Sequence, residues 1–122
     1  MTTVYKIVAA SQWEDAERTG AFAGSEVDTR DGFIHLSTSE QARQTAALHF
    51  NGQAGLLLVA VDAEALGDAL KYEPSRGGAL FPHLYAPLST ASVRWVRPLP
   101  LDVAGNHVFP ALSGAEMPKS RS

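Results

Sequence analysis

Apolar and polar residues alternate along several short segments of the chain with the two-residue period of a β-strand. These segments are residues 3–8, 33–36, 70–73 and 92–97. The continuous apolar run Gly55–Val61 instead predicts a strand that is buried on both faces. Pro82 and Pro87 interrupt the stretch around residues 81–85, so we expect an extended segment there rather than a central strand.

Two further segments have the three- and four-residue spacing of an amphipathic helix. The first begins with an S-x-x-E capping box at Ser11 and ends at Gly20. The second is expected over residues 38–50, after the same capping pattern at Ser37. Its apolar stripe consists of Ala42, Ala46 and Phe50. Residues 20–32 are rich in glycine and charge, which predicts a loop.

The order of these elements favours an α+β fold with small mixed or antiparallel sheets and two main helices. Both helices come early and the later strands follow one another, unlike the alternation of a doubly wound parallel fold. A length of 122 residues fits one domain. We place this domain at residues 1–112 and expect residues 113–122, which are small, polar and charged, to form a disordered tail.

Composition narrows the classes of function. With 45% hydrophobic and 19% charged residues the chain has the composition of a folded globular protein. A net charge of -3 argues against double-stranded nucleic acid as a partner, and the absence of cysteine excludes thiolate chemistry and fits a cytoplasmic location. No apolar run approaches the roughly 20 residues of a membrane helix, and no signal peptide pattern is present. The sequence leaves the oligomeric state open.

Two pairs of side chains, each two residues apart, are candidates for chemistry. His35 and Ser37 should face one side of their strand, beside a helix start that favours anions. His83 and Tyr85 have the same spacing in an extended segment. The structural alternatives are a buried histidine bonded to the backbone and a packed aromatic corner.

A third candidate is the segment that contains Glu73 and Arg76, where a proline and two glycines predict a mobile loop able to close over a ligand. Arg76 could bind a phosphate or carboxylate through two hydrogen bonds, and the alternative is a surface ion pair. No spacing matches a zinc site, so we expect no metal. A hydrolase triad of Ser37, His35 and Asp31 would lack the G-x-S-x-G elbow.

These motifs together resemble the signature of domain-of-unknown-function family 952. The resemblance covers about residues 3–110. It rests on Tyr5-Lys6-Ile7, Trp13, residues 31–37 with Gln41, Glu73 with Ser75-Arg76, and residues 81–85. It implies a compact bacterial α+β domain related in fold to ADP-ribosyltransferases and RNA 2'-phosphotransferases, which bind NAD in a cleft between two small sheets.

The resemblance also implies roles for individual residues, with NAD as the co-substrate. Glu73 would match the glutamate that supports the reacting ribose centre, and His83 would act beside it as the second catalytic candidate. The candidates for ligand binding are His35 and Ser37 at the ribose, Arg76 at the pyrophosphate, and Tyr85, with His83, at the nicotinamide or adenine end.

Three functions therefore remain open. The first is a small cytosolic NAD-binding enzyme of the ADP-ribosyltransferase type. The second is a metal-independent phosphodiesterase with two histidines, because His35-Leu36-Ser37 resembles an H-x-S/T motif, although His83-Leu84-Tyr85 lacks the second hydroxyl in the required place. The third is a non-catalytic module that binds a small anionic or nucleotide-like ligand, or a protein partner.

Overall fold

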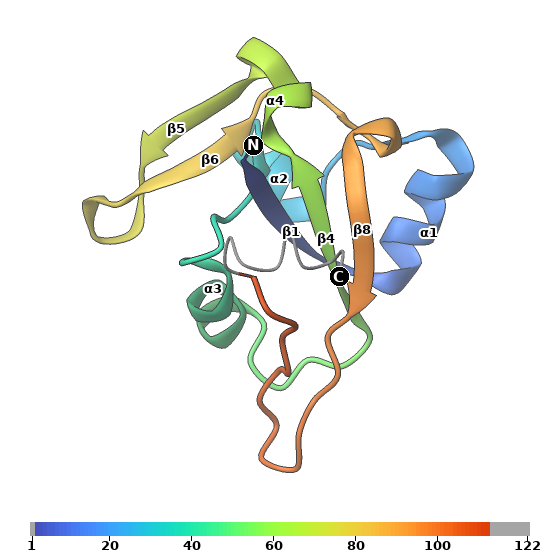
Figure 1. The fold of residues 1–122 in the computed structure, drawn as a ribbon, viewed down its shortest axis with the longest axis vertical. Coiled ribbons are helices and arrows are strands. Elements are labelled where there is room, and N and C mark those ends of the chain that lie inside the picture. The colour runs from blue at the N-terminus through green and yellow to red at the C-terminus, as the bar shows by residue number, and fades with distance from the viewer. Residues whose placement is uncertain (1, 113–122) are drawn as a thin grey trace.

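The computed structural model describes residues 2–112, and within them it forms an α+β fold of antiparallel sheets and short helices (Figure 1). The strands are β1 (Thr3–Ala9), β2 (Ala21–Phe22), β3 (Ile34–His35), β4 (Leu56–Asp62), β5 (Leu70–Pro74), β6 (Leu80–Leu84), β7 (Leu88–Ser89) and β8 (Val93–Pro98). The α-helices are α1 (Ala10–Thr19), α2 (Glu26–Asp31), α3 (Ala42–His49) and α4 (Ala63–Leu66). The segment expected as a disordered tail, residues 113–122, lies outside the described residues.

A three-stranded sheet in the order β1-β4-β8 forms the centre of the molecule and is covered on both faces. Tyr5 and Ile7 of β1 pack towards α3, whereas Val4 and Val8 pack with Trp13 of α1. The predicted alternation of this strand, the buried strand at residues 55–61 and the alanine stripe of the second helix are thus confirmed. None of the helices within residues 2–112 is long and apolar enough to cross a membrane.

The second three-stranded sheet has the order β3-β6-β5, and its β5–β6 hairpin extends away from the central sheet in Figure 1. The expectation that residues 81–85 would avoid a central strand is therefore wrong. Pro82 accepts a hydrogen bond from the amide of Leu36 at 3.0 Å but has no N–H to return. The hydrogen bond that Pro82 cannot donate would lie just beyond His35, where β3 ends. The proline therefore does not interrupt the pairing of β3 with β6.

The loop predicted at residues 74–78 is the turn of this hairpin. Gly77 has a φ of 70° and Gly78 a φ of 85°, left-handed conformations that favour glycine. The amide of Gly78 donates to the carbonyl of Ser75 at 2.6 Å, and the amide of Ser75 donates to Ala79 at 2.9 Å. The segment therefore connects two paired strands.

Neither predicted capping box forms. The first helix already begins at Ala10, so Ser11 lies inside it, and Ala9 at the N-cap makes no side-chain bond. The other helix begins only at Ala42, because Ser37 pairs with Tyr5 of β1 through two backbone hydrogen bonds of 2.9 and 2.8 Å. Ser37 therefore belongs to the edge of the central sheet.

A helix that the sequence reading missed, α2, lies within the region expected to be a loop. Its N-terminus has the capping box in which Ser25 accepts from the backbone of Asp28 while the Asp28 carboxylate accepts from the amide of Ser25. Gly32 ends the helix in the left-handed conformation, with a φ of 88°. The pattern S-x-x-D was available in the sequence as a variant of S-x-x-E.

Replacing Ser25 by alanine should lower the free energy of unfolding by about 1 kcal/mol, because the side-chain bond of the cap is lost. Denaturant unfolding measures the change. Ser11→Ala is the matched control, since Ser11 lies inside α1 and alanine favours a helix interior. Equal losses for the two variants would contradict this account of how α2 begins.

Candidate functional site

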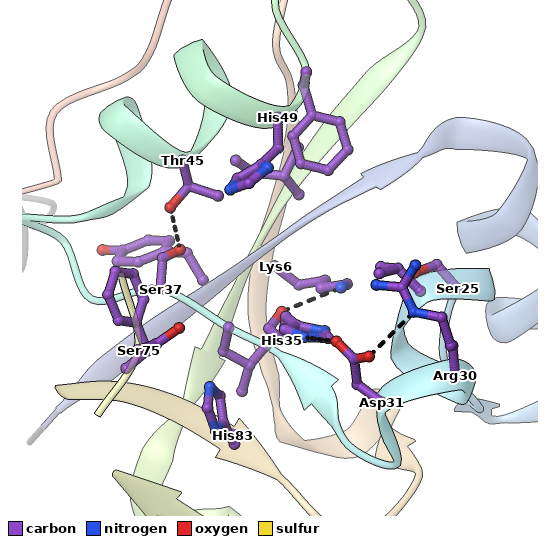
Figure 2. Close-up of a pocket in the computed structure, with 16 residues that line it drawn as sticks. Lys6, Ser25, Arg30, Asp31, His35, Ser37, Thr45, His49, Ser75 and His83 are labelled. Carbon is purple, nitrogen blue, oxygen red and sulfur yellow. Dashed lines mark hydrogen bonds and ion pairs between the residues drawn. The ribbon is translucent and has the colours of Figure 1, made fainter. Parts of the chain in front are cut away.

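A pocket of about 510 Å³ opens where β1, β3 and β6 approach the helices α2 and α3 (Figure 2). The polar side chains that matter most for its chemistry are those of Lys6, Arg30, Asp31, His35, Ser37 and His83. Pockets of this size commonly bind small molecules and cofactors. The pocket therefore defines the candidate site.

His35 and His83 face one another across the β3–β6 pair, where they are directly opposite in register. Hydrogen-bonded and non-hydrogen-bonded pairs alternate along two antiparallel strands. The next pair along, Leu36 and Pro82, is hydrogen-bonded, so His35 and His83 form a non-hydrogen-bonded pair, in which side chains lie closer together. Their ring centroids are 5.8 Å apart in an edge-on arrangement. The two histidine motifs thus meet in the fold.

Glu73 holds the ring of His83 from the neighbouring strand β5. Its Oε1 lies 2.7 Å from Nδ1 of His83 and also accepts a 2.7 Å bond from the hydroxyl of Tyr85. These bonds, that of Tyr85 first, lower the pKa of Glu73, and the same contact raises the pKa of Tyr85. With Nδ1 as the donor to Glu73, Nε2 of His83 is the acceptor nitrogen of the neutral ring.

Phe33 packs against this group of rings. Its ring stacks on His83 with centroids 4.0 Å apart, and it lies 4.6 Å from the ring of His35 and 5.3 Å from that of Tyr85. Aromatic contacts restrict how far each ring can turn. Phe33 therefore fixes both histidines in place.

His35 lies between two carboxylates of α2. Its Nδ1 is 2.6 Å from Oδ1 of Asp28, and its Nε2 is 3.0 Å from Oδ2 of Asp31. Only a ring with protons on both nitrogens can donate to both acceptors at once. The two contacts differ in their surroundings, because the Asp28 side chain is 1% exposed and that of Asp31 is 34% exposed.

Lys6 completes the network from the central sheet as a buried cation. Its Nζ donates to Oδ2 of Asp28 at 2.9 Å, to Oδ1 at 3.2 Å and to the carbonyl of His35 at 3.1 Å, which accounts for all three of its protons. Burial lowers the pKa of Lys6, although Asp28 opposes this shift. Lys6 thus serves to neutralise Asp28 and bind the backbone of β3.

Asp28 is the most heavily bonded group in the site. Burial alone would raise its pKa, but the bond with His35, the charge of Lys6 and the amide of Ser25 together hold the pKa well below its ordinary value. Its Oδ1 also accepts the backbone amide of His35 at 3.0 Å. Lys6 and Asp28 therefore bind the free backbone edge of β3 where another strand would otherwise pair.

The helix α3 forms the opposite wall. Ser37 Oγ and Thr45 Oγ1 lie 3.1 Å apart, and Ser37 is buried. His49 of α3 is exposed and lines the same pocket, as Figure 2 shows. His107 lies outside the pocket, with Nε2 2.8 Å from the carbonyl of Gln53.

The structure brings together five of the six residues chosen from the sequence. Three of them line the pocket, a fourth contacts the His83 ring, and the fifth binds the fourth; in that order the five are His35, Ser37 and His83, then Glu73, then Tyr85. The backbone of Arg76 lies in the turn of the β5–β6 hairpin, but its side chain is outside the described part of the chain. Within residues 2–112, no three histidine, cysteine or acidic side chains are grouped to hold a metal.

Sequence reasoning missed two charged residues of the pocket wall, Lys6 and Arg30, and the buried Asp28 that binds Lys6 behind the wall. A signal for Lys6 was present, since it is a charged residue between apolar neighbours on a strand predicted to pack on both faces. Such a lysine needs an acidic partner. The sequence pattern did not identify which acidic residue pairs with Lys6.

The chain closely resembles solved structures of one bacterial protein, CC0527 from Caulobacter crescentus. Its crystal structure is 53% identical with a TM-score of 0.85, covering 88% of this chain and 94% of that one. Its solution NMR structure is 55% identical with a TM-score of 0.78, covering 87% and 91%. No curated protein matches the chain. The model of the family "Protein of unknown function (DUF952)" matches residues 7–96, and this protein therefore belongs to the DUF952 family.

Proposed function

We propose that this protein is an NAD-binding enzyme of the ADP-ribosyltransferase type, acting at the pocket between α2, α3 and the β3–β6 pair. The observation that carries the proposal is that the His35-Leu36-Ser37 segment meets His83, from a distant part of the chain, at one cavity of about 510 Å³. Arg30 contributes a guanidinium to its wall, whereas Lys6 is neutralised by Asp28. A cavity with these groups suits a nucleotide that bears phosphates.

The residues of this chain would have separate roles in the transfer reaction. Bound NAD would supply the ADP-ribosyl group, whose bond to nicotinamide breaks as the bond to an acceptor forms. His83, with Nδ1 held by Glu73, would take the proton of the acceptor at Nε2. Ser37 and His35 would position the ligand on the opposite side. Glu73 would act through His83, as a positioning residue.

Calorimetric titration with NAD tests this function directly. Wild-type protein is expected to bind NAD, and His35→Ala should weaken binding about tenfold, because a hydrogen bond to the ligand is lost. His107→Ala is the matched control, since His107 lies outside the pocket. The function fails if millimolar NAD gives no heat, or if both variants bind as the wild type does.

A second candidate, a metal-independent phosphodiesterase, is favoured by the opposition of His35 and His83 with their rings 5.8 Å apart. Two imidazoles at such a separation can act as acid and base on one phosphate. Turnover of a cyclic phosphodiester that is lost in both His35→Ala and His83→Ala would put this candidate first. Recovery of intact NAD after long incubation would instead support a non-catalytic binding module.

A further inference from the structure

The carboxylate of Asp31 lies between the imidazole ring of His35 and the guanidinium of Arg30 in the pocket wall. Its Oδ2 is 3.0 Å from Nε2 of His35, and its Oδ1 accepts from Nε of Arg30 at 3.2 Å. Figure 2 shows Asp31 between His35 and Arg30, with a dashed line to each. Two oxygens of one anion are therefore shared between a histidine and an arginine, as they would be in a bound phosphate.

Asp31 is also the one acid of this network that can move without disturbing the core. It is the last residue of α2, is followed by Gly32, and has a side chain that is 34% exposed. Asp28, by contrast, is buried and holds the other nitrogen of His35. Rotation of Asp31 into solvent would free Nε2 of His35 while Nδ1 stays fixed.

The charge that remains after such a movement favours an anion. Lys6 is balanced by Asp28, with which it forms a buried ion pair. Arg30 and His35 would then face the pocket without a carboxylate between them. A guanidinium presents several N–H groups in a plane that matches the oxygens of a phosphate.

We propose that Arg30 and His35 form a subsite for a phosphate or pyrophosphate group, and that Asp31 occupies this subsite until a ligand displaces it. The inference rests on the proposed function only in placing a phosphate-bearing ligand in this pocket. It differs from the role implied for Arg76 by resemblance, since it assigns the anion to Arg30 on α2.

The first test is calorimetric titration with inorganic pyrophosphate at low ionic strength, using single variants. Asp31→Asn should bind pyrophosphate about threefold to tenfold more tightly than the wild type, because the competing carboxylate loses its charge. Arg30→Gln should bind it more weakly by a similar factor. Unchanged or weaker binding in Asp31→Asn would overturn the proposal.

The chain offers a matched pair of controls. Asp15 and Arg18 form the same kind of exposed ion pair within α1, away from the pocket. Asp15→Asn and Arg18→Gln change the net charge by the same amounts and should leave pyrophosphate binding unchanged. If these controls changed pyrophosphate binding by the same factor, the effect would come from the net charge of the protein, and the proposed subsite would be overturned.

Three further comparisons separate this inference from the proposed function. If the variants change the affinity for pyrophosphate as expected but NAD does not bind, the subsite stands and the NAD function fails. If NAD binds and Asp31→Asn leaves the binding of both ligands unchanged, the function stands and the subsite is overturned. Loss of pyrophosphate binding in Arg76→Gln, with no loss in Arg30→Gln, would likewise overturn it.

Discussion

Asp28→Asn should lower the free energy of unfolding by about 3–5 kcal/mol, because it leaves the ammonium of Lys6 buried without a countercharge. Lys6 is only 5% exposed, so the charge cannot reach water without disrupting the packing of β1. The amide keeps the shape of the carboxyl group and one acceptor oxygen. Denaturant unfolding of the variant and the wild type measures the loss.

Lys6→Met is expected to cost less than Asp28→Asn. Without Lys6, the Asp28 carboxylate still accepts from the amides of Ser25 and His35 and from the His35 ring. The double variant should be more stable than Asp28→Asn alone, since no buried ammonium remains. An additive result would contradict the account of Lys6 and Asp28 as a coupled pair.

The same pair should govern stability in acid. The pKa of Asp28 is lowered in the fold, so its ionised form stabilises the protein above the unfolded pKa of about 3.9. This contribution is lost as the pH falls below about 4 towards the lower pKa of the folded state. Stability of Asp28→Asn should therefore fall less steeply over that range than stability of the wild type.

If the protein acts on NAD as proposed, His83→Gln should reduce release of nicotinamide by about a hundredfold to ten-thousandfold, the usual loss when a general base is removed. The reason lies in Nε2 of His83, the nitrogen that is left as an acceptor when Nδ1 donates to Glu73. The reduction should appear in kcat more than in KM. His107→Gln, outside the pocket, should retain full activity.

Variants of Glu73 distinguish a positioning role from a merely structural one. Glu73→Gln retains an oxygen that can accept from Nδ1 of His83, so it should keep much of kcat. Glu73→Leu should lose most of it and should shift the acidic limb of the pH–rate profile. If both variants lost activity equally with an unchanged profile, Glu73 would not act through His83.

Much of this fold could be predicted because alternation and helical spacing are local signals. The strands at residues 3–8 and 55–61 are examples, since burial on both faces of the central sheet leaves a clear pattern. The helix α2 was not predicted because its many charged residues are typical of a loop, although a capping box precedes them. Pro82 led to the wrong prediction that residues 81–85 avoid a central strand. Its effect depends on where the neighbouring strand β3 ends, which is a property of the tertiary structure.

The site was predictable only in part for the same reason. His35 and His83 each stood out in short motifs, and the structure places them opposite one another. The ion pair of Lys6 with Asp28 joins segments that no local pattern connects. Propensity and spacing describe neighbours along the chain, whereas a buried ion pair is decided by which segments pack together.

The passage of the chain from His35 to Ser37 makes two sheets mechanically dependent on one another. His35 is in register with His83 in one sheet, and Ser37 pairs with Tyr5 in the other, so a single residue, Leu36, separates the two attachments. Leu36 is itself buried. The two sheets are thus joined beside the pocket by one buried residue, which limits how far they can shift relative to one another without breaking one of the two attachments.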